Sequence, residues 1–113
     1  MNINKFIEES ARTMSDSWHP ENIKTETFHG IIGVAGEAGE LLDAAKKAVF
    51  YNHELDKENL REEIGDIMWY IAAIIRSEGW DIESILQENI DKLRKRYPES
   101  FSSELARERF DKK

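Results

Sequence analysis

The sequence contains no cysteine, which excludes disulfide bonds, zinc–thiolate sites, iron–sulfur clusters and thiol nucleophiles. It has no apolar run near the ~20 residues of a membrane span, and its first ten residues lack the charged and apolar regions of a secretory signal. Positive charge is also scarce, since 16 Lys and Arg stand against 23 Asp and Glu and give a net charge of −7. Non-specific binding of a nucleic-acid polymer needs a basic surface. We therefore expect a cytoplasmic protein with no membrane and no nucleic-acid polymer among its partners.

Proline is almost as scarce, because Pro20 and Pro98 are the only two, and the apolar residues between them recur at helical spacing. Asp56 and Asp81 are expected to cap the starts of the two later helices, and Gly79 to end the first of these. The pattern predicts helices over 3–14, 25–51, 57–78 and 82–97, with a short further helix over 102–110. The expected fold is all-α, similar to a four-helix bundle with antiparallel packing, in a single domain spanning 1–113.

Glycine is concentrated in the second predicted helix, where Gly30, Gly33, Gly36 and Gly39 recur at every third position. Each glycine in a helix interior costs about 0.5–1 kcal/mol relative to alanine. Four such costs within ten residues indicate the close approach of another backbone or of a ligand. Tight packing of one helix on another, with no ligand, explains the pattern equally well.

Two carboxylate pairs stand within the most apolar parts of their helices. Glu37 and Glu40 are three residues apart on the second helix, and Glu63 and Asp66 repeat that spacing on the third, so each pair shares one helix face. Antiparallel packing would bring all four together, and four such anions repel strongly unless cations neutralise them. Oxygen ligands favour a hard ion, Mg²⁺ or Mn²⁺. The alternative is a solvated acidic surface.

A di-iron carboxylate site is disfavoured. Such a site needs Glu-x-x-His on two helices, and a single stretch, Glu26 to His29, has that spacing in this chain.

The fourth predicted helix carries the complementary charge. Asn89 interrupts its apolar stripe, and Lys92 and Arg96 follow on the same side at i+3 and i+7. An amide, a point cation and a forked cation suit a polyphosphate. The alternative is an Asn packed against a backbone carbonyl, with Lys92 and Arg96 in water.

Taken together, these motifs resemble a known family. The stretches Gly36-Glu-Ala-Gly-Glu-Leu41, Glu62-Glu-Ile-Gly-Asp-Ile67 and Asn89-Ile-Asp-Lys-Leu-Arg-Lys-Arg-Tyr-Pro98 are similar to the E-x-x-E…E-x-x-D signature and basic helix of the MazG-like all-α nucleoside triphosphate pyrophosphohydrolases. The resemblance covers residues 25–98 and is nearest to the short single-domain members and the dCTP pyrophosphatase group. Phosphoribosyl-ATP pyrophosphatases and dimeric dUTPases share the scaffold, so the substrate does not follow from the motif.

The resemblance implies hydrolysis of an NTP or dNTP to the monophosphate and pyrophosphate. It implies Mg²⁺ ligands at Glu37, Glu40, Glu63 and Asp66, which with Lys92 form the expected catalytic set. The residues leave open which carboxylate, Glu62 included, orients the attacking water. A non-catalytic helical interaction module is the rival hypothesis.

The chain is expected to form a homo-oligomer, a dimer or a tetramer. The second and third predicted helices carry apolar residues around more of their circumference than one small bundle covers. The family resemblance points the same way.

A nucleobase site is predicted from aromatic residues around the start of the second helix. Trp18 and His29 are the expected base-binding residues, with His19 and Phe28 beside them. His29 precedes Glu37 by two turns, about 12 Å along the helix axis. The alternative is that Trp18 and Phe28 only fasten the first loop onto the bundle. Trp69 and Trp80 are expected in the core or in an interface.

Overall fold

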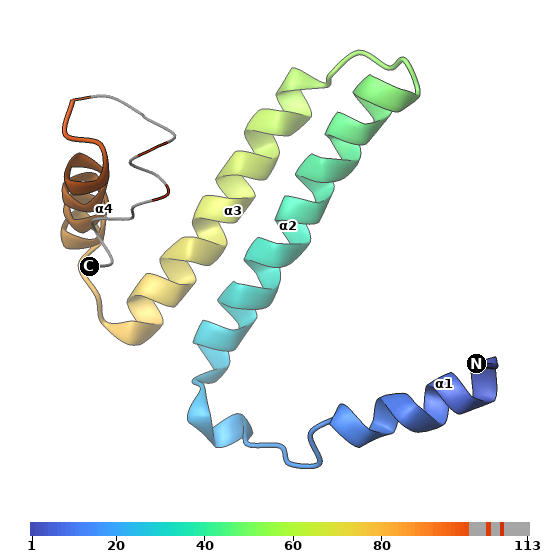
Figure 1. The fold of residues 1–113 in the computed structure, drawn as a ribbon. Helices are drawn as coiled ribbons and strands as arrows, with labels where there is room; N and C mark the ends of the chain where they lie inside the picture. The colour runs from blue at the N-terminus through green and yellow to red at the C-terminus, as the bar shows by residue number, and fades with distance from the viewer. Residues whose placement is uncertain (100–103, 105–106, 108–113) are drawn as a thin grey trace.

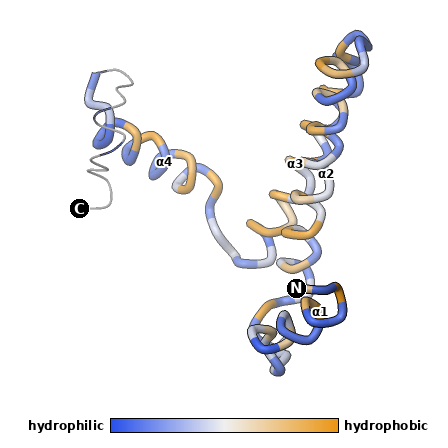
Figure 2. The backbone as a smooth tube through the Cα atoms, turned by 45° about the vertical axis from the view of Figure 1, so that its right-hand side comes forward, coloured by the Kyte–Doolittle hydropathy of each residue, from blue (hydrophilic) through white to orange (hydrophobic). Residues whose placement is uncertain are grey.

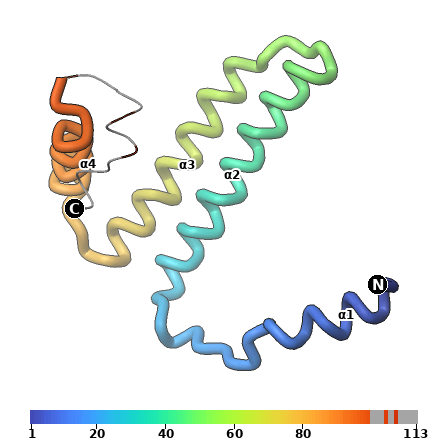
Figure 3. Tube along the Cα trace, viewed as in Figure 1, coloured from blue at the N-terminus to red at the C-terminus, as the bar shows by residue number. Residues whose placement is uncertain are grey.

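The computed structural model describes residues 1–99, 104 and 107, and within them it contains helices and no strand. The elements follow one another as α1 (Ile3–Ser10), η1 (Ala11–Thr13), η2 (Pro20–Asn22), α2 (Thr25–Phe50), α3 (Lys57–Glu78) and α4 (Ile82–Arg96). Figures 1 and 3 show α2 and α3 side by side, with α1 and α4 projecting from the same end of that pair. The expected all-α class is confirmed. The short helix expected over 102–110 falls outside the described residues apart from single positions.

The helix ends lie where local capping chemistry predicts them. The Asp56 carboxylate accepts a hydrogen bond from the Asn59 N–H at 2.9 Å, and Asp81 does the same for the Ser84 N–H at 3.0 Å. Gly79 ends α3 with a φ of 70°, in the left-handed region that favours glycine. The predicted bounds of the second, third and fourth helices are therefore confirmed to within one residue.

The first helix is shorter than predicted. It ends at Ser10 and continues to Thr13 as a tighter 3-10 turn, although its apolar spacing extends to Met14. The Ser10 and Thr13 hydroxyls donate to backbone carbonyls three residues earlier, those of Ile7 and Ser10. Such bonds compete with the α-helical ladder and favour helix ends.

Two of the four glycines allow α2 and α3 to approach closely. A Cβ at Gly30 would lie 2.9 Å from the Tyr70 backbone oxygen, and a Cβ at Gly33 would overlap the Tyr70 ring. Gly36 and Gly39 have no such neighbour within 4 Å among the residues described. Helix packing thus accounts for Gly30 and Gly33, and it does not account for the other two.

Polar contacts fasten the open end of the α2–α3 hairpin. The buried Thr27 hydroxyl donates to the Glu78 carboxylate at 2.6 Å and lies 2.8 Å from the Ser77 hydroxyl. Arg76 forms an ion pair with Glu26, again joining the two helices. The hairpin is therefore held at one end by these contacts and at the other by the connecting residues 51–56.

The expected four-helix bundle does not close within one chain. Of the described helices, α2 and α3 are the only two α-helices that pack extensively on each other. The radius of gyration is 19.9 Å, against about 13 Å for a compact domain of this size. Because α2 and α3 each bury a single stripe against the other, their remaining apolar residues stay exposed, as at Leu42 and Met68. The apolar stripe of α4 is exposed as well, as at Leu86. Figure 2 shows these hydrophobic segments along α2, α3 and α4.

Within the described part of the chain, no helix has both the length and the apolar character needed to cross a membrane.

Candidate metal centre and nucleotide site

Three of the four predicted carboxylates converge between α2 and α3. Glu37 from α2, and Glu63 and Asp66 from α3, each offer an oxygen, and these oxygens all lie within 4.8 Å of one another. Glu37 and Glu63 are half-buried and Asp66 is exposed. The convergence follows from the antiparallel packing of α2 and α3, which brings Glu37 opposite the Glu63 and Asp66 pair.

The charge on this cluster is not balanced by the protein. The pKa of Glu63 is raised to about 7. The largest cause is its hydrogen bond with Glu37, followed by partial burial and by repulsion from the charges of Glu37, Glu40 and Asp66. Glu63 Oε2 is buried and has no hydrogen-bond partner among the described residues. A buried acceptor with no donor, within a set of oxygen-only ligands, is what a hard divalent cation fits. The residues present therefore fit a divalent metal.

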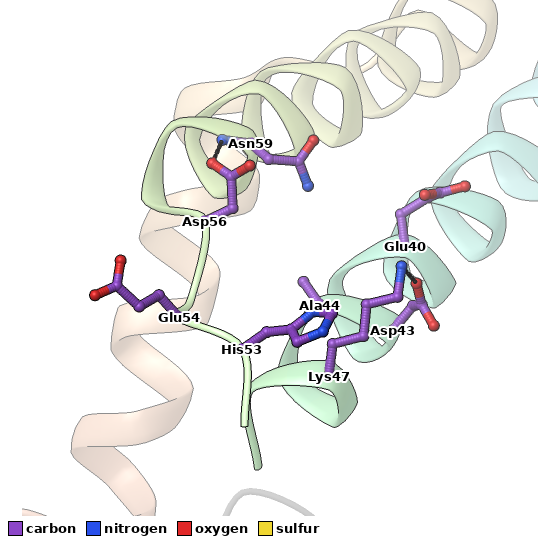
Figure 4. Close-up of a pocket in the computed structure, with 8 residues that line it drawn as sticks. All are labelled: Glu40, Asp43, Ala44, Lys47, His53, Glu54, Asp56 and Asn59. Atoms are coloured by element: carbon purple, nitrogen blue, oxygen red, sulfur yellow. Dashed lines mark hydrogen bonds and ion pairs between the residues drawn. The ribbon is translucent and has the colours of Figure 1, made fainter. Parts of the chain in front are cut away.

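Glu40 stands outside this three-oxygen set. It acts on Glu63 through its charge, and it lines a cavity of about 430 Å³ between α2 and α3, next to the connecting segment. The residues around that cavity are Glu40, Asp43, Ala44, Lys47, His53, Glu54, Asp56 and Asn59, shown in Figure 4. The cavity thus continues the acidic cluster toward the closed end of the hairpin.

An ion pair crosses one wall of this cavity. The Lys47 ammonium lies 2.9 Å from Asp43, and the Lys46 ammonium lies 3.9 Å from the same carboxylate. The pKa of Asp43 is lowered by its hydrogen bond with Lys47 and by the attraction between their charges, and the same contact raises the pKa of Lys47. Both side chains therefore remain charged at neutral pH.

The predicted phosphate-binding residues are not brought to this cluster within one chain. Asn89, Lys92 and Arg96 lie on α4, which does not pack extensively on α2 or α3 within the part of the chain that the structure describes (Figure 1). The Arg96 guanidinium instead lies over the Tyr97 ring, 5.9 Å from its centroid. The triplet can meet an acidic cluster only if α4 adopts another position or reaches another chain.

The two predicted base-binding residues lie in different surroundings. Trp18, with His19 and Phe28, lines an apolar cavity of about 280 Å³ around the start of α2, and Trp18 is 77% exposed. His29 lies instead 5.9 Å, between ring centroids, from Tyr70. Trp69 and Trp80 are 63% and 57% exposed, so the expectation of a core position is wrong for both, and an interface position stays a prediction.

Tyr70 lies beside the candidate site, and sequence reasoning assigned it no role. Its ring covers Gly33, contacts His29 and meets Trp69 edge-on with centroids 5.2 Å apart. It follows Asp66 by one helical turn, so it stands between the acidic cluster and His29. The spacing Glu63, Asp66, Tyr70 on one helix face was the signal that could have identified it.

The fold and the cluster define an all-helical protein with an acidic metal-type centre between two antiparallel helices. The MazG nucleotide pyrophosphohydrolase domain family matches residues 30–101, which include all four carboxylates, and the chain belongs to this family. The Gene 37 protein of Mycobacterium phage L5 is 30% identical over 69 residues, which are 58% of this chain and 60% of that protein. The chain therefore spans about 60% of this curated relative's length. No solved structure shows significant similarity.

Proposed function

We propose that the protein hydrolyses a nucleoside or deoxynucleoside triphosphate to the monophosphate and pyrophosphate in a Mg²⁺-dependent reaction. The observation that supports this most directly is the convergence of Glu37, Glu63 and Asp66, with Glu63 Oε2 buried and unpartnered in the described structure. Membership of a nucleotide pyrophosphohydrolase family supplies the reaction class.

The four carboxylates hold the cation in this proposal. Glu37, Glu63 and Asp66 supply the converging oxygens, and Glu40, whose charge acts on Glu63, completes the set. Mg²⁺, for which Mn²⁺ can substitute, neutralises phosphate charge and lowers the pKa of a bound water. The half-buried positions of Glu37 and Glu63 fix their oxygens before the substrate arrives.

The nucleobase binds near the start of α2. The exposed Trp18 ring offers a stacking surface, and its apolar cavity is shared with Phe28. His29 and Tyr70 lie between this region and the carboxylates, within reach of a sugar or a base edge. The axial separation of about 12 Å from His29 to Glu37 suits a nucleotide with its phosphates at the cluster.

The active form is a homo-oligomer, a dimer or a tetramer. The open shape of the single chain and the exposed apolar faces of α2, α3 and α4 support this. An oligomer also gives Asn89, Lys92 and Arg96 a way to meet an acidic cluster, because α4 of one copy can lie against the hairpin of another.

The test is a panel of NTPs and dNTPs with Mg²⁺, with phosphoribosyl-ATP included and the products resolved by phosphorus NMR. We expect pyrophosphate and the monophosphate from at least one member. Release of orthophosphate, or no turnover of any member, would falsify the proposal. The exposed apolar faces favour one rival, a non-catalytic interaction module, which predicts no turnover at all.

A further inference from the structure

The cavity at the closed end of the α2–α3 hairpin presents donor groups beside the metal centre. Eight residues line its volume of about 430 Å³, and Glu40 joins it to the carboxylate cluster. In Figure 4 the Asn59 side chain projects from α3 toward α2, the His53 ring lies beside Ala44, and Lys47 extends along α2 to Asp43. Sequence reasoning assigned no role to Lys47 or His53.

Most of the acidic groups that line this cavity are already engaged. Asp43 pairs with Lys47 at 2.9 Å, and Asp56 accepts the Asn59 N–H at 2.9 Å as the cap of α3. The Glu54 carboxylate points away from the other lining side chains in Figure 4. Glu40 belongs with the metal centre, where a bound cation offsets its charge.

The groups left to meet a ligand are hydrogen-bond donors. The Lys47 ammonium carries three N–H bonds and Asp43 takes one of them, while the Asn59 amide and the His53 ring can each donate as well. The backbone holds Lys47 and His53 together, because the Lys47 carbonyl accepts from the N–H groups of Tyr51, at 3.1 Å, and His53, at 3.2 Å. A phosphate anion that binds together with a metal cation suits these donors, because the cation offsets the negative charge of the neighbouring carboxylates.

We propose that this cavity binds the two terminal phosphates of the substrate, and the pyrophosphate product, through Lys47, His53 and Asn59. The inference rests on the proposed function, and it orients the bound nucleotide along the α2–α3 hairpin. The base lies toward the start of α2 and the phosphates cross the carboxylates. The Lys47 ammonium lies beside Asp43, which is six residues or about 9 Å beyond Glu37 along the axis, and there it meets the terminal phosphates. These donors share one hairpin with the carboxylates, so the subsite exists within a single chain.

The experiment measures the binding of magnesium pyrophosphate to the full chain by calorimetry, which requires no turnover. Lys47→Met is expected to weaken binding by about tenfold or more, or at least 1.4 kcal/mol. The matched control is Lys46→Met, because Lys46 is the neighbouring lysine, also faces Asp43, and does not line the cavity. That control should bind pyrophosphate as the unmodified protein does.

A second variant distinguishes two roles of Lys47, direct contact with phosphate and neutralisation of the Asp43 charge. Lys47→Met alone leaves the Asp43 carboxylate with the more distant Lys46, at 3.9 Å, in place of its hydrogen-bonded partner. Asp43→Asn with Lys47→Met removes both charges and keeps the net charge. If Lys47 contacts phosphate, the double variant remains weak. Recovery of full affinity in the double variant means that Lys47 only neutralises Asp43, and it overturns the proposal.

The outcomes for the cavity and for the reaction are distinguishable. Unchanged pyrophosphate binding in Lys47→Met, or no pyrophosphate binding by the unmodified protein with Mg²⁺, overturns the cavity assignment even if triphosphates are hydrolysed. Pyrophosphate binding that depends on Lys47 supports the cavity assignment even if no triphosphate is turned over, and in that case only the proposed reaction fails.

Discussion

Alanine substitutions along the glycine stripe of α2 should separate helix packing from helix propensity. At Gly30 the new Cβ would lie 2.9 Å from the Tyr70 carbonyl oxygen, and that oxygen cannot move unless α3 moves with it. At Gly36 no atom of the described neighbourhood lies within 4 Å of the new Cβ. Both substitutions gain about 0.5–1 kcal/mol of helix propensity. The difference in free energy of unfolding between them is therefore the cost of overpacking alone.

That cost sets the expected magnitude. Forcing a methyl group into a closely packed contact costs about 1–3 kcal/mol. We expect Gly36→Ala to be about 0.5–1 kcal/mol more stable than the unmodified protein, and Gly30→Ala to be about 1–3 kcal/mol less stable than Gly36→Ala. Gly33→Ala should also be less stable than Gly36→Ala, because the Tyr70 ring, overlapped as far as its Cγ, has to move away from His29 and Trp69 to make room.

The assay is urea unfolding followed by circular dichroism, at several protein concentrations because association couples to stability. Equal stability of Gly30→Ala and Gly36→Ala would refute the close approach of α3. A loss of stability in Gly36→Ala that grows with protein concentration would refute the open surroundings of Gly36 and indicate contact with a second copy.

Four further predictions concern the site and the assembly. Replacing any one of the four carboxylates with its amide should abolish most turnover without unfolding the protein; the variants are Glu37→Gln, Glu40→Gln, Glu63→Gln and Asp66→Asn. Full activity in two of them would contradict a metal site made of these four residues. Without metal, stability should fall as pH rises from about 4.5 to 7 and level off above, because the raised pKa of Glu63, about 7, makes the folded chain keep a proton that the unfolded chain loses. Thermal melts of Glu63→Gln should lose this slope while Glu62→Gln keeps it, and a slope that persists in Glu63→Gln would exclude Glu63 as its source. Trp18→Ala should raise KM and blur discrimination among bases with metal affinity intact, whereas unchanged base preference with a lower Tm would support a structural role. Light scattering at micromolar concentration should give the mass of a dimer or tetramer, and a monomeric mass would rule out the oligomer.

The parts of the fold that the sequence predicts well depend on local chemistry. Asp56, Gly79 and Asp81 mark helix ends through bonds and dihedral angles within a few residues, so their positions are readable without the rest of the chain. The first helix was misjudged because hydroxyl-to-carbonyl bonds at Ser10 and Thr13 oppose its apolar periodicity.

The candidate site was predictable in part for a related reason. The i, i+3 spacing places each carboxylate pair on one face, and antiparallel helices then bring two faces together. Which oxygens come closest depends on the register of α2 against α3, and Glu40 fell outside the three-oxygen set for that reason. Lys47 and His53 were missed because their proximity depends on how residues 51–56 turn, which no spacing rule encodes. The position of α4 depends on the surface that its apolar stripe covers, and periodicity does not identify that surface.

The close contacts at the glycines of α2 oppose the repulsion within the carboxylate cluster. Above the raised pKa of Glu63, about 7, the charges of Glu37, Glu63 and Asp66 repel one another midway along the hairpin. On one side of them, the contact at Gly30 and the bonds of Thr27 hold the two helices together. On the other side, the connection through residues 51–56 prevents separation. Contacts on both sides therefore hold the carboxylate oxygens within 4.8 Å of one another, and a cation bound there would relieve their repulsion.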